Sequence, residues 1–140
     1  MILLINKIMK KIFNTILKLI FSLIILMPVL GVIGIFPAPT SDLYNTPQAF
    51  AFIEILNASG YIMYMMAIVS LATLFCLWTK RVALGAILIL PVTLNIVGFH
   101  AFLDGGLFTG GAVMGNLLLL INLYFLYKHR NEYSSLLSTN

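Results

Sequence analysis

Few side chains in this sequence are capable of chemistry, and two of them lie in the apolar segment 91–100, where Asn95 and His100 follow Pro91. A polar or ionisable side chain inside a membrane segment is costly, and such residues usually face the interior of a helix bundle. An imidazole near neutral pH can donate or accept a hydrogen bond, and an amide can do both. The segment is therefore the starting point for a candidate binding site.

Five other polar residues are expected at a depth in the bilayer similar to that of Asn95 and His100, because they lie near the same ends of the apolar segments. Glu54 and Asn57 are one helical turn apart and can face together. Together these side chains predict one outer-leaflet pocket. Its members are Glu54, Asn57, Tyr61, Asn95, His100, Asp104 and Asn116.

A structural role explains the same residues. Asn95 and Asn116 can form a hydrogen bond between two helices, a contact that averages about 0.6 kcal/mol in membranes. His100 can bond a backbone carbonyl or Asp104, which lies one turn further along. Asn95 and His100 are also separated by about 140° on a regular helix, so they share a face only if Pro91 distorts it. Both interpretations stay open from the residues alone.

Several classes of chemistry are disfavoured by the residues present. Cys76 is the single cysteine, so the chain has no intrachain disulfide and no Cys-x-x-Cys pair. His100 and His129 are expected on opposite sides of the membrane, which argues against a bis-histidine haem. No nucleotide-binding glycine motif is present, and the spacing of Glu54, His100 and Asp104 matches no metal signature. No cofactor is evident, and a quinone is the one candidate.

The composition indicates the solvent for which the chain is built. Of the 140 residues, 61% are hydrophobic and only 9% are charged. A soluble domain of this size could not hide so much apolar surface, so the lipid bilayer is the expected surrounding. The eight lysines and arginines lie within 1–18, at Lys80 and Arg81, and at Lys128 and Arg130. Because they flank apolar segments, the net charge of +4 indicates a membrane protein and not a nucleic-acid partner.

The elements that position the candidate site are helices. We predict an all-α membrane protein, a four-transmembrane-helix bundle with a short interfacial helix between the first and second spans. Each span is near the ~20 residues that a bilayer requires. The expected spans are about 19–36, 61–78, 82–103 and 112–127.

The segments outside the spans have their own signals. Thr46 followed by Pro47 predicts the start of the short helix, and Gly60 lies past its end. Residues 1–18 are expected to form a basic amphipathic lead-in that lies at the lipid surface and runs into the first span, and 128–140 a cytoplasmic tail. A cleaved signal peptide is the alternative for the N-terminus. Its apolar core would be unusually long, however, and no clean cleavage site follows.

Small residues mark the helix faces that are expected to pack closely. Glycine allows two helices to approach because it lacks a Cβ atom. Gly111 and Gly115 form a G-x-x-x-G pair, and Asn122 continues their face. Gly31 and Gly34 offer a second close-packing position near the end of the first span.

The positive charges predict an orientation. With four spans, the segments before the first, between the second and third, and after the fourth lie on one side of the membrane. These segments hold all eight basic residues. The other two loops hold none, but they contain Asp42, Glu54 and Asp104. The positive-inside rule then places both termini in the cytoplasm, with the chain in the cytoplasmic (inner) membrane.

The segment 84–96, LGAILILPVTLNI, followed by Phe99 and His100, resembles the third span of DoxX-like membrane proteins. Similar too are 59–61, the short turn at 80–81, and the loop and helix before the second span. The resemblance covers about 16–130. It implies a four-helix membrane bundle. The wider family includes the membrane subunit of thiosulfate:quinone oxidoreductases and proteins that assist the maturation of redox enzymes. Only Asn95 and His100 carry over, as positions of the shared motif.

Three functions are compatible with these features. The first is a non-catalytic accessory subunit that docks a partner membrane or redox protein, or a second copy of the chain. The second is a quinone-binding subunit in which His100 donates to a quinone carbonyl and Glu54 or Asp104 handles protons. The quinone ring would then stack on Phe99, Phe102 or Tyr61. The third is a lipid or small-solute binding protein that uses the same pocket. The scarcity of reactive groups favours the first.

Overall fold

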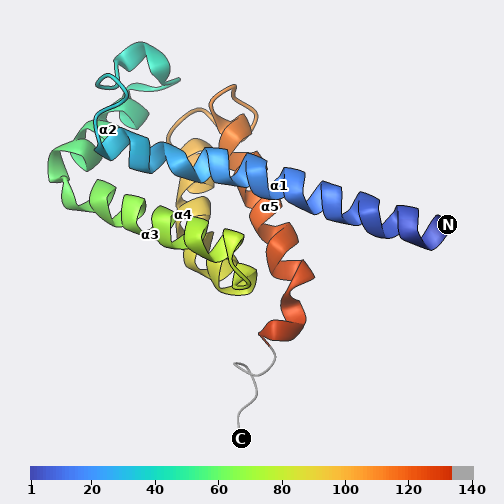
Figure 1. The fold of residues 1–140 in the computed structure, drawn as a ribbon. Helices are drawn as coiled ribbons and strands as arrows, with labels where there is room; N and C mark the ends of the chain where they lie inside the picture. Colours follow the sequence, from blue (N-terminus) through green and yellow to red (C-terminus); the bar gives the residue numbers. More distant parts are fainter. Residues whose placement is uncertain (134–140) are drawn as a thin grey trace, which may run out of the picture.

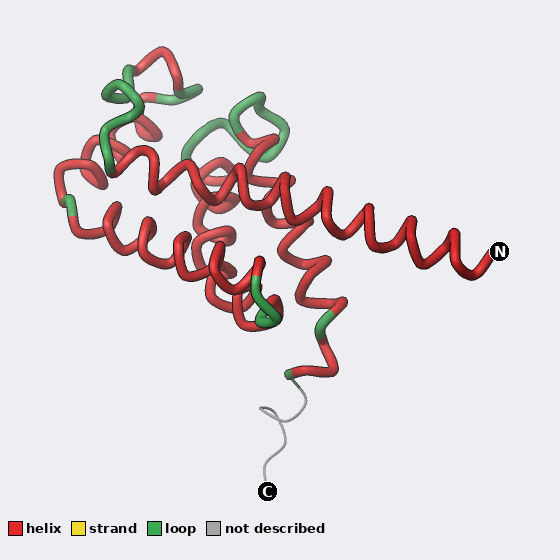
Figure 2. Tube along the Cα trace, viewed as in Figure 1, coloured by secondary structure: helices red, strands yellow, loops and turns green. Residues whose placement is uncertain are grey.

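Five α-helices make up most of the described chain in this computed structural model, which describes residues 1–133. The helices are α1 (Ile2–Val32), α2 (Pro47–Ser59), α3 (Tyr61–Trp78), α4 (Val82–Phe102) and α5 (Ala112–Lys128). Two 3-10 turns, η1 (Ser41–Leu43) and η2 (Arg130–Glu132), complete the described part, which contains no β-strand (Figure 1, Figure 2). The predicted all-α class is therefore confirmed. Of the predicted tail, 134–140 lie outside the described residues.

The four longer helices form an open bundle in the order α1, α3, α4 and α5. Each packs against the next, whereas α5 returns to α1 through a smaller contact (Figure 1). Phe21 of α1 and Phe125 of α5 meet edge to face in the core, with ring centroids 5.7 Å apart. Leu77, Ile89 and Leu118 fill the space around them. In lipid, such packing contacts are a main source of attraction between helices.

The N-terminal helix contains two segments that are predicted separately from the sequence. The predicted lead-in, 1–18, continues without a break into most of the predicted first span, 19–36, in one helix of 31 residues, about 46 Å long at ~1.5 Å per residue. Its N-terminal part projects beyond the other helices (Figure 1). The helix ends at Val32 because the chain turns at Gly34, whose φ of 76° favours glycine. The Gly34 N–H donates to the Gly31 carbonyl at 3.0 Å and closes this turn.

Three helices, α1, α3 and α4, are long and apolar enough to cross a membrane, which indicates a membrane-embedded, multi-pass protein. α5 is also apolar, but it has only 17 residues. α2 starts after Thr46, whose hydroxyl accepts a hydrogen bond from the Ala49 N–H at 3.1 Å. It ends at Gly60, whose φ is 66°. The start and stop signals predicted for this short helix are confirmed.

Close packing of α4 and α5 depends on one face of α5. A Cβ atom at Gly115 would lie 2.9 Å from Ile96 Cγ2, which is too close for any other residue without a shift. Asn122 is fully buried on this face, and its Nδ2 donates to the Ala86 carbonyl at 3.0 Å. Gly111 lies against His100, where a Cβ atom would be 3.2 Å from Cε1. All three predicted packing residues of α5 and its N-cap therefore face α4.

The glycines near the end of α1 behave differently. No neighbouring atom of the described residues lies within 4 Å of a Cβ atom placed at Gly31 or Gly34. The prediction that these two glycines admit a neighbouring helix is therefore wrong within this chain. Gly34 serves the turn that ends the helix instead.

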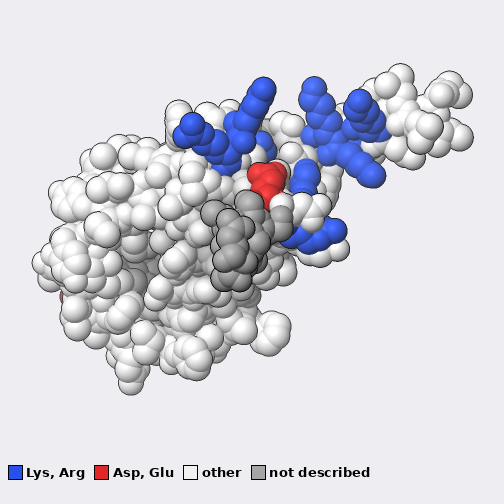
Figure 3. All heavy atoms as spheres, turned by 90° about the horizontal axis from the view of Figure 1, so that it is seen from below, with Lys and Arg blue, Asp and Glu red and all other residues white. Residues whose placement is uncertain are grey.

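The basic residues gather at one end of the bundle, called the basic end below (Figure 3). Lys18 Nζ donates to the Leu77 carbonyl at 2.7 Å, near the end of α3. Lys128 Nζ donates to Asn14 Oδ1 at 2.5 Å and so joins the end of α5 to α1. Basic segments that are far apart in the sequence thus meet in space. The opposite end, with the loops 33–46 and 103–111, is called the loop end.

Candidate functional site

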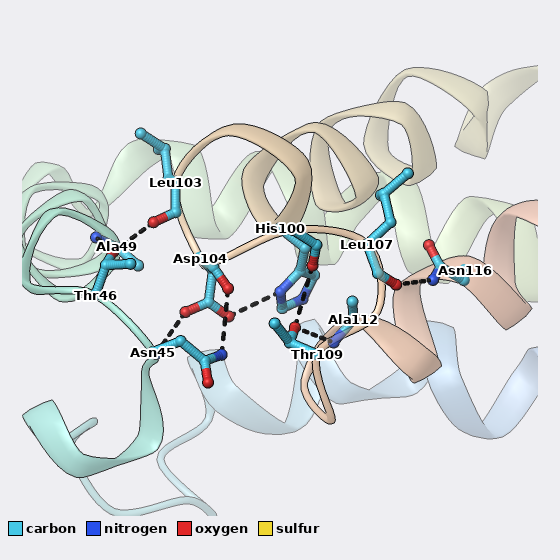
Figure 4. A network of polar contacts seen from close by, with 11 residues as sticks. Asn45, Thr46, Ala49, His100, Leu103, Asp104, Leu107, Thr109, Ala112 and Asn116 are labelled. Atoms are coloured by element: carbon cyan, nitrogen blue, oxygen red, sulfur yellow. Dashed lines mark hydrogen bonds and ion pairs between the residues drawn. The ribbon is translucent and has the colours of Figure 1, made fainter.

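Asp104 is the centre of a buried polar network at the loop end. Its side chain is 2% exposed, directly after α4. The Asn45 backbone N–H donates to Oδ1 at 2.8 Å, and Asn45 Nδ2 donates to the Asp104 carbonyl at 3.2 Å. The Thr46 hydroxyl donates to the Leu103 carbonyl beside them. These contacts fasten the loop before α2 to the end of α4, and we call them the loop clasp (Figure 4).

His100 is the other partner of Asp104. Its Nδ1 lies 2.9 Å from Asp104 Oδ2, one helical turn away. A carboxylate acceptor at this position places the proton of the neutral imidazole on Nδ1 and leaves the Nε2 lone pair available. The ring lies against α5, since Cβ atoms at Gly111 and Gly115 would be 3.2 Å from Cε1 and 3.5 Å from Cδ2. Nε2 joins these two carbons, so it is directed toward the gap between the glycines.

Tyr44 covers the clasp with an aromatic side chain. Burial, and next the nearby Asp104 charge, raise the pKa of the Tyr44 phenol above its usual value. Its ring lies 6.2 Å from the Phe99 ring at an edge-to-face angle and 5.9 Å from that of Phe50. The tyrosine thus links the loop before α2 to the end of α4.

The structure brings only part of the predicted pocket together. His100 and Asp104 are in direct contact. Asn116 Nδ2 donates to the Leu107 carbonyl at 2.7 Å, so it holds the loop between α4 and α5 (Figure 4). Asn95 Nδ2 donates to the Pro91 carbonyl of its own helix at 2.8 Å. The bond between Asn95 and Asn116 considered above is therefore not formed.

The other three predicted residues lie apart from the clasp. Glu54 and Asn57 are exposed on α2, and Tyr61 is 68% exposed at the start of α3. None of the three makes a side-chain hydrogen bond within the described residues. In contrast, Asn45 and Ser70 take part in buried polar sites that the sequence did not identify. Asn45 could have been found as the residue before the Thr46 helix cap, but Ser70 gave no signal beyond its small size.

Two cavities flank α4. The larger, about 970 Å³, lies between α2, α3 and α4, and we call it the aromatic groove. Phe52 and Phe99 stack in its wall, with ring centroids 5.9 Å apart and planes inclined by 29°. Asn95 contributes its amide. This volume is at the upper end of the range for small-molecule pockets, about 300–1,000 Å³.

The smaller cavity, about 390 Å³, lies between α1, α3, α4 and α5, and we call it the wedge cavity. Ser70 and His100 line it, together with Gly111 and Gly115. Val92 and Ile96 border both cavities, so α4 is the wall between them. His100 and Phe99 are neighbours in the chain, yet they serve different cavities. Asn95 and His100, which are predicted from the sequence to share one pocket, line the aromatic groove and the wedge cavity respectively.

Comparisons with known proteins leave the function to be argued from this geometry. No protein-family model matches the chain, and no curated protein or solved structure matches it. Among residues 1–133, no group of three His, Cys, Asp or Glu side chains is arranged to hold a metal ion. The chemistry that the site offers is therefore hydrogen bonding by amide, imidazole and hydroxyl groups beside apolar surfaces.

Proposed function

We propose that the chain is a DoxX-like, four-span protein of the cytoplasmic (inner) membrane, with both termini in the cytoplasm. α5 supplies the fourth span, about 25 Å long at ~1.5 Å per residue, and its packing against α4 supports this assignment. The meeting of the basic segments at one end of the bundle supports the orientation, because positive charge favours the cytoplasmic side. α2 then lies at the opposite, outer interface.

In this membrane the chain serves as a non-catalytic accessory subunit that binds a lipophilic ligand of the quinone class for a partner redox or maturation complex. The observation that carries this proposal is the aromatic groove, which is large, apolar and open. The groove lies beside α2 at the loop end, within reach of a ligand that is dissolved in the bilayer. Apolar pockets with a few polar groups are typical of such ligands.

Asn95 gives the groove its polar recognition group. Its side chain makes one hydrogen bond in the described structure, through Nδ2 to the Pro91 carbonyl. The second N–H of the amide and the Oδ1 atom remain available. A quinone carbonyl can accept from this N–H, and a hydroquinone hydroxyl can donate to Oδ1. One amide therefore suits both oxidation states, while Phe99 offers its ring for stacking.

His100 does not contact the quinone in this proposal. The side chain lines the wedge cavity and not the aromatic groove, and Asp104 is fully engaged by the loop clasp. Glu54 and Tyr61 also do not line the groove. The ligand contacts are thus reassigned from His100, Glu54 and Tyr61 to Asn95 and Phe99.

The test is to release the protein gently from its own membrane and to identify bound lipophiles and polypeptides by native mass spectrometry. A bound molecule of quinone mass is expected, with a stoichiometric partner protein. Asn95→Leu should lower the occupancy by short-chain ubiquinone about fivefold, as expected for one lost hydrogen bond. Gln48→Leu, on the exposed surface of α2, is the matched control and should change nothing.

Three results would count against the proposal or a part of it. Protein that carries neither a lipophile nor a partner under several gentle detergents would remove both parts of it. Equal ubiquinone occupancy in wild type, Asn95→Leu and a Phe99→Ala variant would show that the aromatic groove is not the binding site. A bound phospholipid in place of a quinone would exclude the quinone class, and it would retain the groove as a site only if Asn95→Leu or Phe99→Ala lowers its occupancy.

A further inference from the structure

The wedge cavity opens sideways between α1 and α5. These two helices touch near the basic end, where Phe13 and Tyr124 lie 6.0 Å apart between ring centroids and Phe21 meets Phe125. Towards the loop end, Met27 of α1 and Met114 of α5 line the cavity and are 46% and 49% exposed. The opening therefore faces the lipid in a bilayer. Flexible methionine side chains suit a contact with chains of varied shape.

Ser70 lines the wedge cavity and carries a hydroxyl group that makes no hydrogen bond within the described residues. The residue is fully buried, and its Oγ has no hydrogen-bond partner in the described structure. Thr73, one turn further along α3, is also buried without a partner, but it does not line the cavity. The buried Thr93 hydroxyl, on the neighbouring helix, donates to the Leu90 carbonyl at 2.8 Å. A buried hydroxyl without a partner costs about 1–3 kcal/mol, so such a group in a native structure needs an explanation.

Two hydrogen-bond acceptors lie in the same cavity wall. His100 lines the cavity, and Asp104 holds its Nδ1, so in the neutral imidazole Nε2 carries the lone pair. Pro28 has no N–H group and cannot donate to the Ile24 carbonyl four residues earlier, and both residues line the cavity. A ligand that satisfies this set must bring hydrogen-bond donors.

The charges narrow the class of ligand further. Within the lining of the wedge cavity, no lysine or arginine is present to pair with a phosphate group. Placing an anionic head group there would leave a charge buried without a partner. The fitting head group is therefore neutral and carries hydroxyl groups, and the lateral opening accommodates its acyl chain.

We propose that the wedge cavity binds the neutral, hydroxyl-bearing head of a glycerolipid, of the monoacylglycerol or diacylglycerol class. One hydroxyl donates to His100 Nε2, and the Ser70 hydroxyl pairs with a second oxygen of the head group. The acyl chain leaves between Met27 and Met114. This site is separate from the aromatic groove, because α4 lies between them, and it does not depend on the function proposed there.

The test compares two probes that differ in their hydroxyl groups, 1-oleoylglycerol and methyl oleate. Binding is measured by native mass spectrometry of the protein in lipid nanodiscs. Wild type should bind 1-oleoylglycerol at least fivefold better than methyl oleate. Ser70→Ala should reduce this preference about fivefold without lowering thermal stability, whereas Ser59→Ala, an exposed serine at the end of α2, should keep it.

Further variants make the outcome decisive. Met114→Trp, which fills the opening, should lower the binding of both probes. Equal binding of the two probes by wild type would overturn the proposal, as would a preference that Ser70→Ala leaves intact. If Asn95→Leu removes the preference and Ser70→Ala does not, the lipid lies in the aromatic groove and the assignment is wrong. Tighter binding of an anionic phosphatidylglycerol than of 1-oleoylglycerol would also refute it.

Discussion

The aromatic groove and the wedge cavity share α4 as a wall, but the polar side chains that line them differ in exposure and in hydrogen bonding. In the groove, Asn95 is partly exposed to the surroundings and already bonded to its own helix. In the wedge cavity, Ser70 is buried without a partner, and His100 is fixed by Asp104 with one nitrogen free. The groove is thus a large apolar surface with an optional polar contact. The wedge cavity is a small site whose lining includes a buried hydroxyl group without a hydrogen-bond partner within the described residues.

The largest effect on stability should come from the loop clasp, whose Asp104 also holds the His100 side chain in the wall of the wedge cavity. Asp104→Ala removes the acceptor of the Asn45 N–H and of His100, and we expect a loss of about 3 kcal/mol in the free energy of unfolding. Thermal unfolding in detergent measures it, with Asp42→Ala, an exposed carboxylate of η1, as the control. Because Asp104 no longer holds the His100 imidazole, the variant should also bind 1-oleoylglycerol less well in the wedge cavity.

The same variant tests the independence of the two cavities. If Asp104→Ala retains wild-type occupancy of the aromatic groove by ubiquinone at a temperature where it is folded, the two sites are separate. A parallel loss of both ligands would show that the clasp organises the whole loop end. An unchanged free energy of unfolding would mean that Asp104 does not hold the loop before α2 to the end of α4.

The next effect concerns the contact of α4 with α5. Gly115→Ala places a Cβ atom 2.9 Å from Ile96 Cγ2, and Ile96 borders both cavities. Such overpacking typically costs about 1–3 kcal/mol. Gly110→Ala is the matched control, since no atom lies within 4 Å of its added Cβ. Equal melting temperatures for the two variants would contradict the close packing of α5 on α4.

The helices were predictable because their signals are local. The Thr46 cap, the Gly60 stop and the apolar lengths of α3 and α4 are all set by neighbouring residues. The division of the N-terminus into a surface lead-in, 1–18, and a span stays a prediction, because α1 runs through both without a residue near Lys18 that breaks the helix. A change in polarity alone does not end a helix.

The candidate site was only partly predictable, because the depth of a residue in the membrane does not determine the direction in which its side chain points. His100 and Asp104 lie one turn apart on one chain segment, so their contact could be anticipated. Glu54 has a similar expected depth but points away on α2. The partnerless state of Ser70 depends on the space between four helices, which no local pattern encodes.

A smaller effect on the free energy of unfolding should distinguish a buried hydroxyl group that has a hydrogen-bond partner from one that has none. Ser70→Ala removes a buried hydroxyl that has no partner in the described structure, so the ligand-free protein should become about 1 kcal/mol more stable. Thr93→Val removes a hydroxyl bonded to Leu90 and should lower stability by up to about 1 kcal/mol. Thermal unfolding of delipidated protein distinguishes the signs. A loss of stability in both variants would show that Ser70 is satisfied in the folded protein.

The smallest effect is expected at Tyr44, which lies outside the membrane-crossing helices and between the clasp and Phe99. Burial first, and the Asp104 charge second, raise the pKa of its phenol above the usual value of about 10. Folding therefore favours the protonated form. The resulting stability is fully present below the unfolded pKa and is lost as the pH rises through the folded pKa. Unfolding measured from pH 8 to 12 should show a steeper alkaline loss in wild type than in Tyr44→Phe. Tyr61→Phe, at a tyrosine that is 68% exposed, is the control and should retain the wild-type slope. Identical slopes for all three proteins would show that Tyr44 does not contribute to stability through its burial beside Asp104.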